Sequence, residues 1–227
     1  MGTSKGYIAP STPHWARAKR GITSYLNDSS NSKKTAAAVG YARAINGDGF
    51  SNSRVVQAFS GVASFAAVSG VKGVDAALKE IGLEDILALP PEDALNELIS
   101  DFANDGATID DALALDCIAD ALTVLEIDSF EDLSRIDTNR LIKEFVCQFS
   151  KHKFAQLFDK QIRNKFPNVE EATAKISELQ EFIYYTIEQE LTSEILSAIN
   201  PQNLASQPII QDTLEKGFKL LEEFYGE

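Results

Sequence analysis

Residues 169–199 carry the pattern that most constrains the fold of this chain. Apolar side chains recur there at intervals of three and four residues, with polar residues between them. The apolar positions are Val169, Ala172, Ile176, Leu179, Ile183, Ile187, Leu191, Ile195 and Ile199. This spacing places them on one face of an α-helix, and the following Asn200-Pro201 ends the pattern. It therefore predicts one long helix in the C-terminal half of the chain.

Helical spacing also describes most of the remaining sequence. The other segments that show it are 14–26, 33–45, 51–68, 75–81, 92–104, 109–125, 138–166 and 209–225. We expect the helix over 138–166 to be irregular near residues 150–152. No alternating apolar and polar pattern of useful length predicts a β-strand. The predicted fold class is all-α, a multi-helix domain with a flexible N-terminal tail and one long helix in the C-terminal half.

The net charge of −13 is unevenly distributed along the chain. Residues 1–74 contain nine Lys or Arg against Asp28 and Asp48, a balance of +7, which leaves −20 for the rest. We therefore divide the chain into a flexible tail over 1–12, a basic, small-residue helical portion over 13–88, and an acidic helical portion over 89–227. We expect residues 13–227 to pack as one unit.

Two interpretations of the basic portion are open. Attraction to the acidic portion, within the fold or across a complex, is the favoured one. The alternative is contact with nucleic-acid phosphates, although the overall negative charge makes a nucleic-acid partner unfavourable. The residues that would make this contact are Arg17, Lys19, Arg20, Lys33 and Lys34.

Residues suited to catalysis or metal binding are scarce. His14 adjoins Trp15, and His152 lies between two lysines, so neither has a sequence context typical of a catalytic base. Cys117 and Cys147 lie in apolar helical patterns and are interpreted as reduced packing thiols. No phosphate-binding glycine motif is present. We therefore expect no enzyme activity, no metal site and no cofactor.

Acidic residues are dense over 101–120, where a calcium loop has to be considered. With Asp101 as its first ligand, Ala103 and Ala112 would occupy positions that need oxygen ligands. The favoured interpretation is a helix cap, in which Thr108 and Asp111 satisfy free backbone amides at a helix start.

The sequence also predicts a cytoplasmic protein that does not contact a membrane. Residues 1–30 lack the apolar run of a secretory signal, because prolines and basic residues interrupt it. The apolar segment 55–71 contains glutamine, serines and glycines, and is interpreted as a buried helix. Gly6 stands where an N-myristoylation motif has Ser or Thr.

The N-terminal sequence points to a family. The chain begins Met1-Gly2-Thr3-Ser4-Lys5-Gly6-Tyr7. A proline-containing segment follows, and then Trp15 at the head of a basic helix, a small-residue segment over 55–70 and an acidic helical remainder. These features together resemble the QatB family of the bacterial Qat anti-phage defence system. The segment Ile8-Ala9-Pro10-Ser11 departs from the family's tail, which is richer in glycine.

The resemblance implies a noncatalytic subunit that works with other proteins of the same system. The most direct partner would be a QueC-like enzyme (QatC), beside an ATPase (QatA) and a TatD-like nuclease (QatD). QueC-like enzymes use ATP to activate the carboxylate of a 7-carboxy-7-deazaguanine for attack by a nitrogen nucleophile. Removal of Met1 would expose the amine of Gly2, which we expect to be that nucleophile. The tail that would enter the enzyme comprises Gly2, Thr3, Ser4, Lys5, Gly6 and Tyr7.

Three other interpretations remain open at this stage. The tail can be an ordinary disordered terminus without a function. The chain can be a protein-protein scaffold that docks the ATPase and nuclease through its C-terminal helices. It can also be a nucleic-acid-sensing adaptor, whose binding would weaken steeply with salt.

Overall fold

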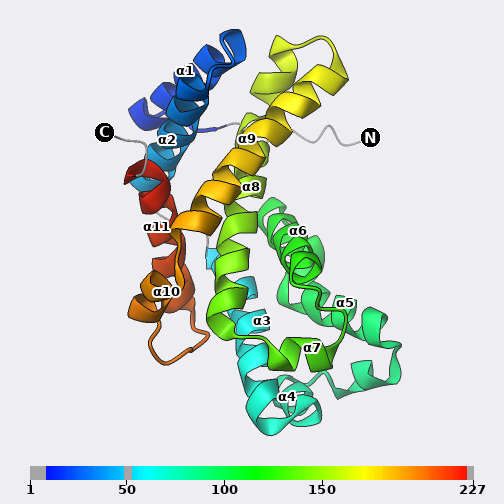
Figure 1. The fold of residues 1–227 in the computed structure, drawn as a ribbon. Helices are drawn as coiled ribbons and strands as arrows, with labels where there is room; N and C mark the ends of the chain where they lie inside the picture. Colours follow the sequence, from blue (N-terminus) through cyan, green and yellow to red (C-terminus); the bar gives the residue numbers. More distant parts are fainter. Residues whose placement is uncertain (1–8, 49–52, 224–227) are drawn as a thin grey trace. The chain divides into compact units, whose positions relative to one another are not determined.

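The computed structural model describes residues 9–48 and 53–223. Over these residues the chain forms α-helices and two short 3₁₀-helices, and no β-strand (Figure 1). The elements are α1 (Pro13–Asn27), α2 (Asn31–Asp48), α3 (Ser53–Lys72), α4 (Val74–Ile81), η1 (Glu84–Ala88), α5 (Pro91–Phe102), η2 (Asn104–Gly106), α6 (Ile109–Val124), α7 (Phe130–Arg135), α8 (Thr138–Lys165), α9 (Val169–Glu190), α10 (Ser193–Ile199) and α11 (Gln207–Glu223). The predicted all-α class is confirmed.

Local sequence accounts for several helix ends. Thr12 occupies the N-cap position of α1, and Pro13 follows it, where a missing backbone N–H costs no helical hydrogen bond. Gly82 ends α4 with a φ of 75°, a left-handed conformation that glycine adopts without strain. α5 begins at Pro91 and carries Glu92 in its first turn, where a negative charge interacts favourably with the helix dipole.

The prediction of one continuous helix over 169–199 is wrong, because the structure has α9 and α10 there. Thr192 leaves the helical conformation, with a φ of −72° and a ψ of 165°, and its hydroxyl accepts a hydrogen bond from the Ile195 amide at 3.5 Å. This is the preferred role of threonine at a helix start. The break shifts the buried face by one residue, so that Leu196 is buried in place of Ile195.

Two further differences concern α7 and α8. The irregularity expected near residues 150–152 is absent, since α8 is one helix of 28 residues. The six-residue helix α7 was not anticipated, because it is too short to show helical periodicity. The Ser129 hydroxyl begins α7 by accepting a hydrogen bond from the Asp132 amide at 3.2 Å.

The chain divides into two compact units with interleaved segments. Unit 1 comprises residues 1–50, 150–190 and 215–227, and unit 2 comprises 51–149 and 191–214. None of these boundaries coincides with the division at residue 88 that was made from the sequence. The expectation that residues 13–227 pack as one unit stays a prediction.

The core of unit 1 is built around Tyr41 of α2. Its ring makes edge-to-face contacts with Phe154 and Phe218 at centroid distances of 5.5 Å, and with Phe158 at 6.1 Å. The Tyr41 hydroxyl donates a hydrogen bond to the Ser150 carbonyl at 3.0 Å. Trp15 of α1 adds a contact with Phe158 at 6.2 Å. Aromatic packing therefore joins α1, α2 and α11 to the second part of α8.

Unit 2 is organised around α3, which packs against α4, α5, α6 and α7. Phe59 of α3 stacks on Phe145 of α8 at 4.5 Å, and Phe65 contacts Phe130 of α7 at 5.6 Å. Gly70 allows α7 to approach, because a Cβ atom there would lie 2.6 Å from the Ser134 carbonyl oxygen. The small residues of α3 therefore serve close helix packing.

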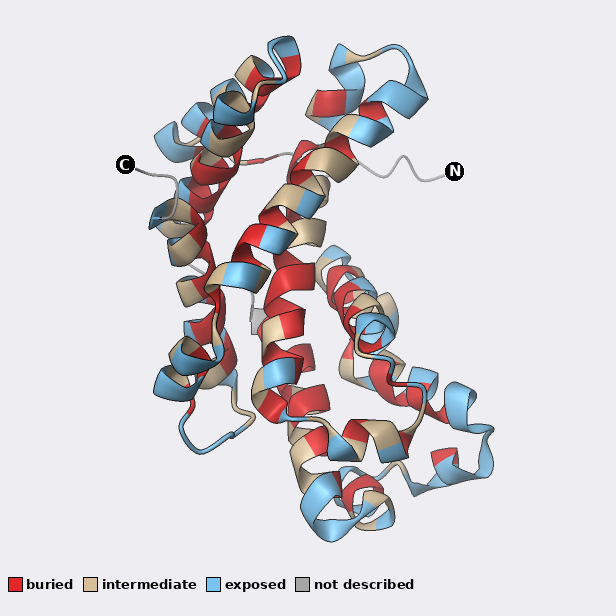
Figure 2. Cartoon of the chain, in the orientation of Figure 1, coloured by how far each residue is buried: buried red, intermediate tan, exposed pale blue. Residues whose placement is uncertain are grey.

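Helix α3 also has the length and composition of a membrane span over Arg54–Lys72. Half of that window is buried inside the protein, and core helices of soluble proteins can have the same length and composition. Figure 2 shows the burial of each residue along the helices. Burial of Val55, Phe59, Val62 and Ala63 agrees with the interpretation of this segment as a buried helix.

Candidate functional site

The predicted tail residues Gly2, Thr3, Ser4, Lys5, Gly6 and Tyr7 lie outside the described residues. The described chain begins with Ala9, which is only 3% exposed. The Lys19 ammonium of α1 donates hydrogen bonds to the carbonyl oxygens of Ala9 at 2.7 Å and Pro10 at 3.0 Å. The Lys19 carbonyl in turn accepts a hydrogen bond from the Gln161 side chain of α8 at 2.9 Å. The N-terminal segment is therefore fixed to α1 at Ala9 and Pro10.

This anchor limits how far Gly2 can lie from the helices. Gly2 lies seven positions before Ala9 in the sequence, and seven Cα–Cα steps of a fully extended chain span roughly 25 Å. Lysine suits the anchor because its ammonium group has three hydrogen-bond donors, so one side chain can hold two carbonyls. The sequence identified Lys19 only as a candidate for the less favoured nucleic-acid contact, and the anchoring role was missed because no sequence signal exists for it.

The five basic residues proposed to contact phosphates do not all remain accessible. Lys19 holds the N-terminal segment, and Lys34 forms an ion pair with Glu178 at 2.6 Å, leaving its side chain 17% exposed. Arg17 and Arg20 are exposed and Lys33 is half-buried, and none of the three forms an ion pair with the described carboxylates. All five residues lie on α1 and α2, and two of them, Lys19 and Lys34, already bind groups within the fold. Nucleic-acid contact by the group stays a prediction.

The Lys34 ion pair belongs to a cluster that connects α1, α2 and α9. Glu178 also accepts a hydrogen bond from Lys175 at 3.0 Å, and the Lys175 ammonium lies 5.3 Å from the centre of the Tyr25 ring. Burial raises the pKa of Glu178, but its contacts with Lys34, Tyr25 and Lys175 outweigh this effect and lower the pKa to about 2.

The same cluster changes the pKa of Tyr25. Burial and the neighbouring Glu178 carboxylate both raise the pKa of the Tyr25 hydroxyl above its ordinary value. That hydroxyl is buried, and it makes no hydrogen bond of regular geometry within the described part of the chain. Both groups therefore keep their ordinary charge near neutral pH, and the cluster stabilises the helix arrangement of unit 1.

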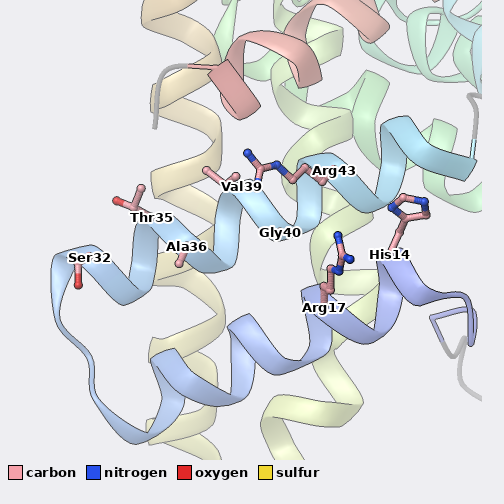
Figure 3. Close-up of a pocket in the computed structure, with 8 residues that line it drawn as sticks. All are labelled: His14, Arg17, Ser32, Thr35, Ala36, Val39, Gly40 and Arg43. Atoms are coloured by element: carbon pink, nitrogen blue, oxygen red, sulfur yellow. The ribbon is translucent and has the colours of Figure 1, made fainter. Parts of the chain in front are cut away.

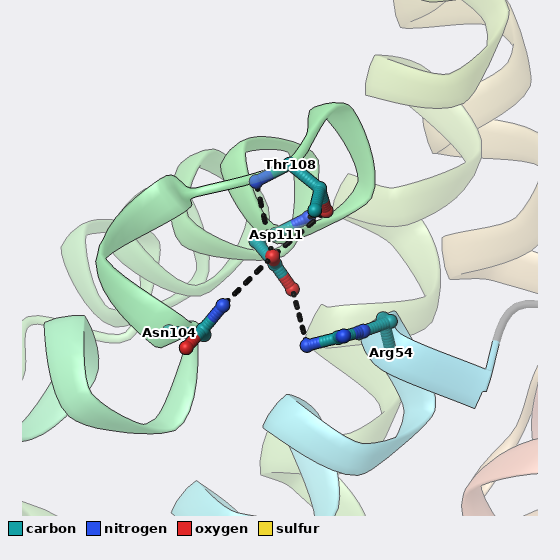
Figure 4. A network of polar contacts seen from close by, with 4 residues as sticks. All are labelled: Arg54, Asn104, Thr108 and Asp111. Carbon is teal, nitrogen blue, oxygen red and sulfur yellow. Dashed lines mark hydrogen bonds and ion pairs between the residues drawn. The ribbon is translucent and has the colours of Figure 1, made fainter.

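The predicted cap at the start of α6 is confirmed (Figure 4). The Thr108 hydroxyl accepts a hydrogen bond from the Asp111 amide at 3.1 Å, and the Asp111 carboxylate accepts one from the Thr108 amide at 3.0 Å. Asn104 donates a further hydrogen bond at 3.2 Å, and Arg54 lies 3.7 Å away as an ion-pair partner. The hydrogen bond from the Thr108 side chain is the main cause of a lowered Asp111 pKa. Asp111 thus acts as a capping residue whose partners are protein groups.

The histidines and cysteines also have identifiable environments. His14 packs over Gly47, where a Cβ atom would lie 3.0 Å from the imidazole ring. His152 is half-buried on α8. Cys117 and Cys147 are both fully buried and form no disulfide, which confirms their interpretation as packing thiols.

Comparison with known families covers most of the helical part of the chain. The family model described as "Qat anti-phage system associated protein QatB" matches residues 51–221. No curated protein and no solved structure matches the chain. The matched range includes the small-residue segment 55–70 and the acidic helices, and it exceeds half of the sequence. The chain therefore belongs to the QatB family and is a component of a Qat anti-phage defence system.

Proposed function

We propose that this chain is a noncatalytic, cytoplasmic subunit whose Gly2 amine is the acceptor for a deazaguanine supplied by a QueC-like enzyme. The observation that carries the proposal is the anchor formed by Lys19, Ala9 and Pro10. It gives the segment that contains Gly2 a fixed starting point on α1. Membership of the QatB family supports a partner within the same defence system.

The chemistry requires only an exposed amine from this subunit. After Met1 is removed, the Gly2 nitrogen attacks the ATP-activated carboxylate of a 7-carboxy-7-deazaguanine. An amide bond forms, the activating group leaves with the bonding electrons, and the proton from the amine passes to solvent. An α-amine has a pKa of about 7.7–8.0, against about 10.4 for lysine, so near pH 7 roughly a tenth of it is in the nucleophilic neutral form. Gly2 is therefore a better acceptor than Lys5.

The anchor makes the reaction dependent on geometry. The catalytic centre of the partner has to lie within roughly 25 Å of Ala9, since the intervening residues cannot span more. Fixing Ala9 also lowers the conformational entropy that the tail loses when it enters the enzyme. Residues 3–7 have small or polar side chains for the most part, so they suit a narrow entry channel.

Reconstitution with purified proteins tests the acceptor. The full chain without Met1 is incubated with the QueC-like partner, ATP and 7-carboxy-7-deazaguanine, and intact mass and the N-terminal peptide are measured. We expect a mass gain of one deazaguanine acyl group on Gly2. Gly2→Glu retains Met1 and should show no gain, whereas Thr3→Ala should be modified normally. A gain that persists in Gly2→Glu, or that maps to Lys5, would contradict the proposal.

The role of the anchor is tested separately. Lys19→Met keeps the aliphatic part of the side chain but removes the ammonium that holds Ala9 and Pro10. We expect severalfold slower modification at limiting enzyme, with the site unchanged. Arg20→Gln is the matched control, because it removes a positive charge from the same helix without touching the anchor. Equally slow modification of Lys19→Met and Arg20→Gln would show that the loss of positive charge, and not the loss of the anchor, causes the effect.

Phage protection distinguishes this function from the scaffold. A complete system in which residues 2–8 of this chain are deleted should lose protection against phage. Full protection by the deletion variant would favour a protein-protein scaffold for the ATPase and nuclease. Binding to nucleic acid that weakens steeply with salt and disappears on charge reversal of Arg17 and Arg20 would instead indicate an adaptor.

A further inference from the structure

A groove of about 490 Å³ lies over the seam between α1 and α2 of unit 1 (Figure 3). Its floor includes Gly40, where the helices are so close that a Cβ atom would lie 3.3 Å from the Ala18 Cα. Ala36, one turn earlier on α2, is exposed in the groove. The absence of large side chains at these two positions leaves the seam open.

Cationic groups gather at one end of the groove. Arg17 reaches it from α1 with His14 near it, and Arg43 reaches it from α2 with its guanidinium turned back toward Val39 (Figure 3). Arg17 forms no ion pair with a described carboxylate. Arg43 uses its Nε atom for Glu222, at 3.1 Å, which leaves the two terminal nitrogens for another acceptor. Two guanidinium groups from facing helices suit the binding of an oxyanion, which accepts paired hydrogen bonds from each planar group.

The other end of the groove is neutral and polar. Ser32 and Thr35 line it with hydroxyl groups. Along α2, Arg43 lies eight positions after Thr35, which corresponds to a rise of about 12 Å. The arrangement suits a ligand with an anionic group at one end and a neutral hydrogen-bonding body. An acidic peptide would place negative charges along the whole groove, where only one end offers cations.

We propose that this groove binds a small phosphorylated ligand of nucleotide size. The phosphate contacts Arg17 and Arg43, and the neutral part of the ligand extends toward Ser32 and Thr35. The volume lies within the range of about 300–1,000 Å³ that is typical of small-molecule sites. The groove lies outside residues 51–221, and it involves neither Gly2 nor the tail. The inference is therefore independent of the proposed modification.

Calorimetric titration of the full chain with ADP tests the proposal. We expect saturable binding of one ADP per chain, at least tenfold weaker in Arg17→Gln and in Arg43→Gln. Arg20→Gln is the matched control, since this exposed residue of α1 lies outside the groove, and its affinity should stay within twofold of the wild type. Arg17→Gln is the cleaner variant, because Arg43→Gln also removes the hydrogen bond to Glu222.

A second variant tests the shape of the groove without changing its charge. Ala36→Leu places a larger side chain in the open seam, and ADP binding should weaken at least tenfold while the circular dichroism spectrum stays that of the wild type. Unchanged ADP affinity in this variant would overturn the assigned location.

Other outcomes would also overturn the proposal. One is the absence of ADP binding at millimolar concentration. Another is an equal loss in Arg20→Gln, which would indicate diffuse charge attraction. If inorganic phosphate bound as tightly as ADP, Ser32 and Thr35 would contribute nothing to the affinity for the ligand. Tighter binding of an oligoglutamate peptide with the same dependence on Arg17 would assign the groove to an acidic protein segment.

Discussion

Replacement of Tyr41 tests which interactions stabilise unit 1. This fully buried side chain donates a hydrogen bond to the Ser150 carbonyl at 3.0 Å, and its ring makes edge-to-face contacts with Phe154, Phe158 and Phe218. Tyr41→Phe removes only the hydroxyl, whereas Tyr41→Leu removes the hydroxyl and the aromatic ring. Comparing the two variants separates the two contributions.

The expected free energies follow from these contacts. Loss of a buried hydrogen bond costs about 1 kcal/mol, so Tyr41→Phe should lower the free energy of unfolding by about that amount. Each aromatic pair contributes about 1 kcal/mol beyond its buried area, so Tyr41→Leu should cost about 4 kcal/mol in total. Tyr185→Phe is the control, because Tyr185 is 58% exposed and should change stability by less than about 0.5 kcal/mol.

Urea unfolding followed by tryptophan fluorescence provides the assay. Trp15 is the chain's single tryptophan, and it contacts Phe158 in the same aromatic cluster, so its emission reports on unit 1. Circular dichroism, measured in parallel, reports on helices of both units. Equal destabilisation by Tyr41→Phe and Tyr41→Leu would refute the reasoning, because it would assign the stability to the hydroxyl alone.

Three further predictions concern packing, capping and pH. Gly70→Ala should lower the free energy of unfolding by about 1–3 kcal/mol in urea titrations, because its Cβ atom would meet the Ser134 carbonyl; a neutral change would contradict the close approach of α3 and α7. Thr108→Ala should cost about 1 kcal/mol by the same assay through loss of the α6 cap, and no loss would contradict that cap. The lowered pKa of Glu178, about 2, gives stability that is present above its unfolded pKa of about 4.3 and is lost as pH falls toward 2. Urea midpoints should therefore fall more steeply between pH 5 and pH 2 in the wild type than in Glu178→Gln, and parallel pH curves would contradict this.

Sequence periodicity predicted most of the helices but misjudged one boundary. The stripe over 169–199 continues across the α9–α10 break, so spacing alone did not reveal it. The sequence Thr192-Ser193-Glu194 contains a capping signal, which the regular apolar stripe outweighed in the prediction. A hydroxyl residue followed by an acidic residue therefore indicates a helix start even inside a regular apolar pattern.

Local and distant polar contacts differ in how far sequence can predict them. Thr108 and Asp111 are three residues apart, and their spacing was sufficient to predict the cap. The partners of Lys34 and Arg54 are Glu178 and Asp111, far away in the sequence, so only the fold could identify them. The distribution of charge along the sequence also does not distinguish basic residues that form ion pairs within the fold from those that stay accessible.

The anchor by Lys19 was missed for a related reason. Its acceptors are backbone carbonyls, which every residue carries and which leave no mark in the sequence. The groove between α1 and α2 also depends on how closely the helices approach at Gly40. Helical spacing in the sequence predicts which residues of α1 and α2 share a face, but it does not determine the distance between the two helices.

The most direct test of the central claim is the intact mass of this chain, purified from cells that express it alone or with the complete Qat system. The account predicts a mass without Met1 in the first case, and a further gain of one deazaguanine acyl group on the Gly2 peptide in the second. An identical mass without Met1 in both samples would contradict the account and leave this QatB-family chain as an unmodified scaffold.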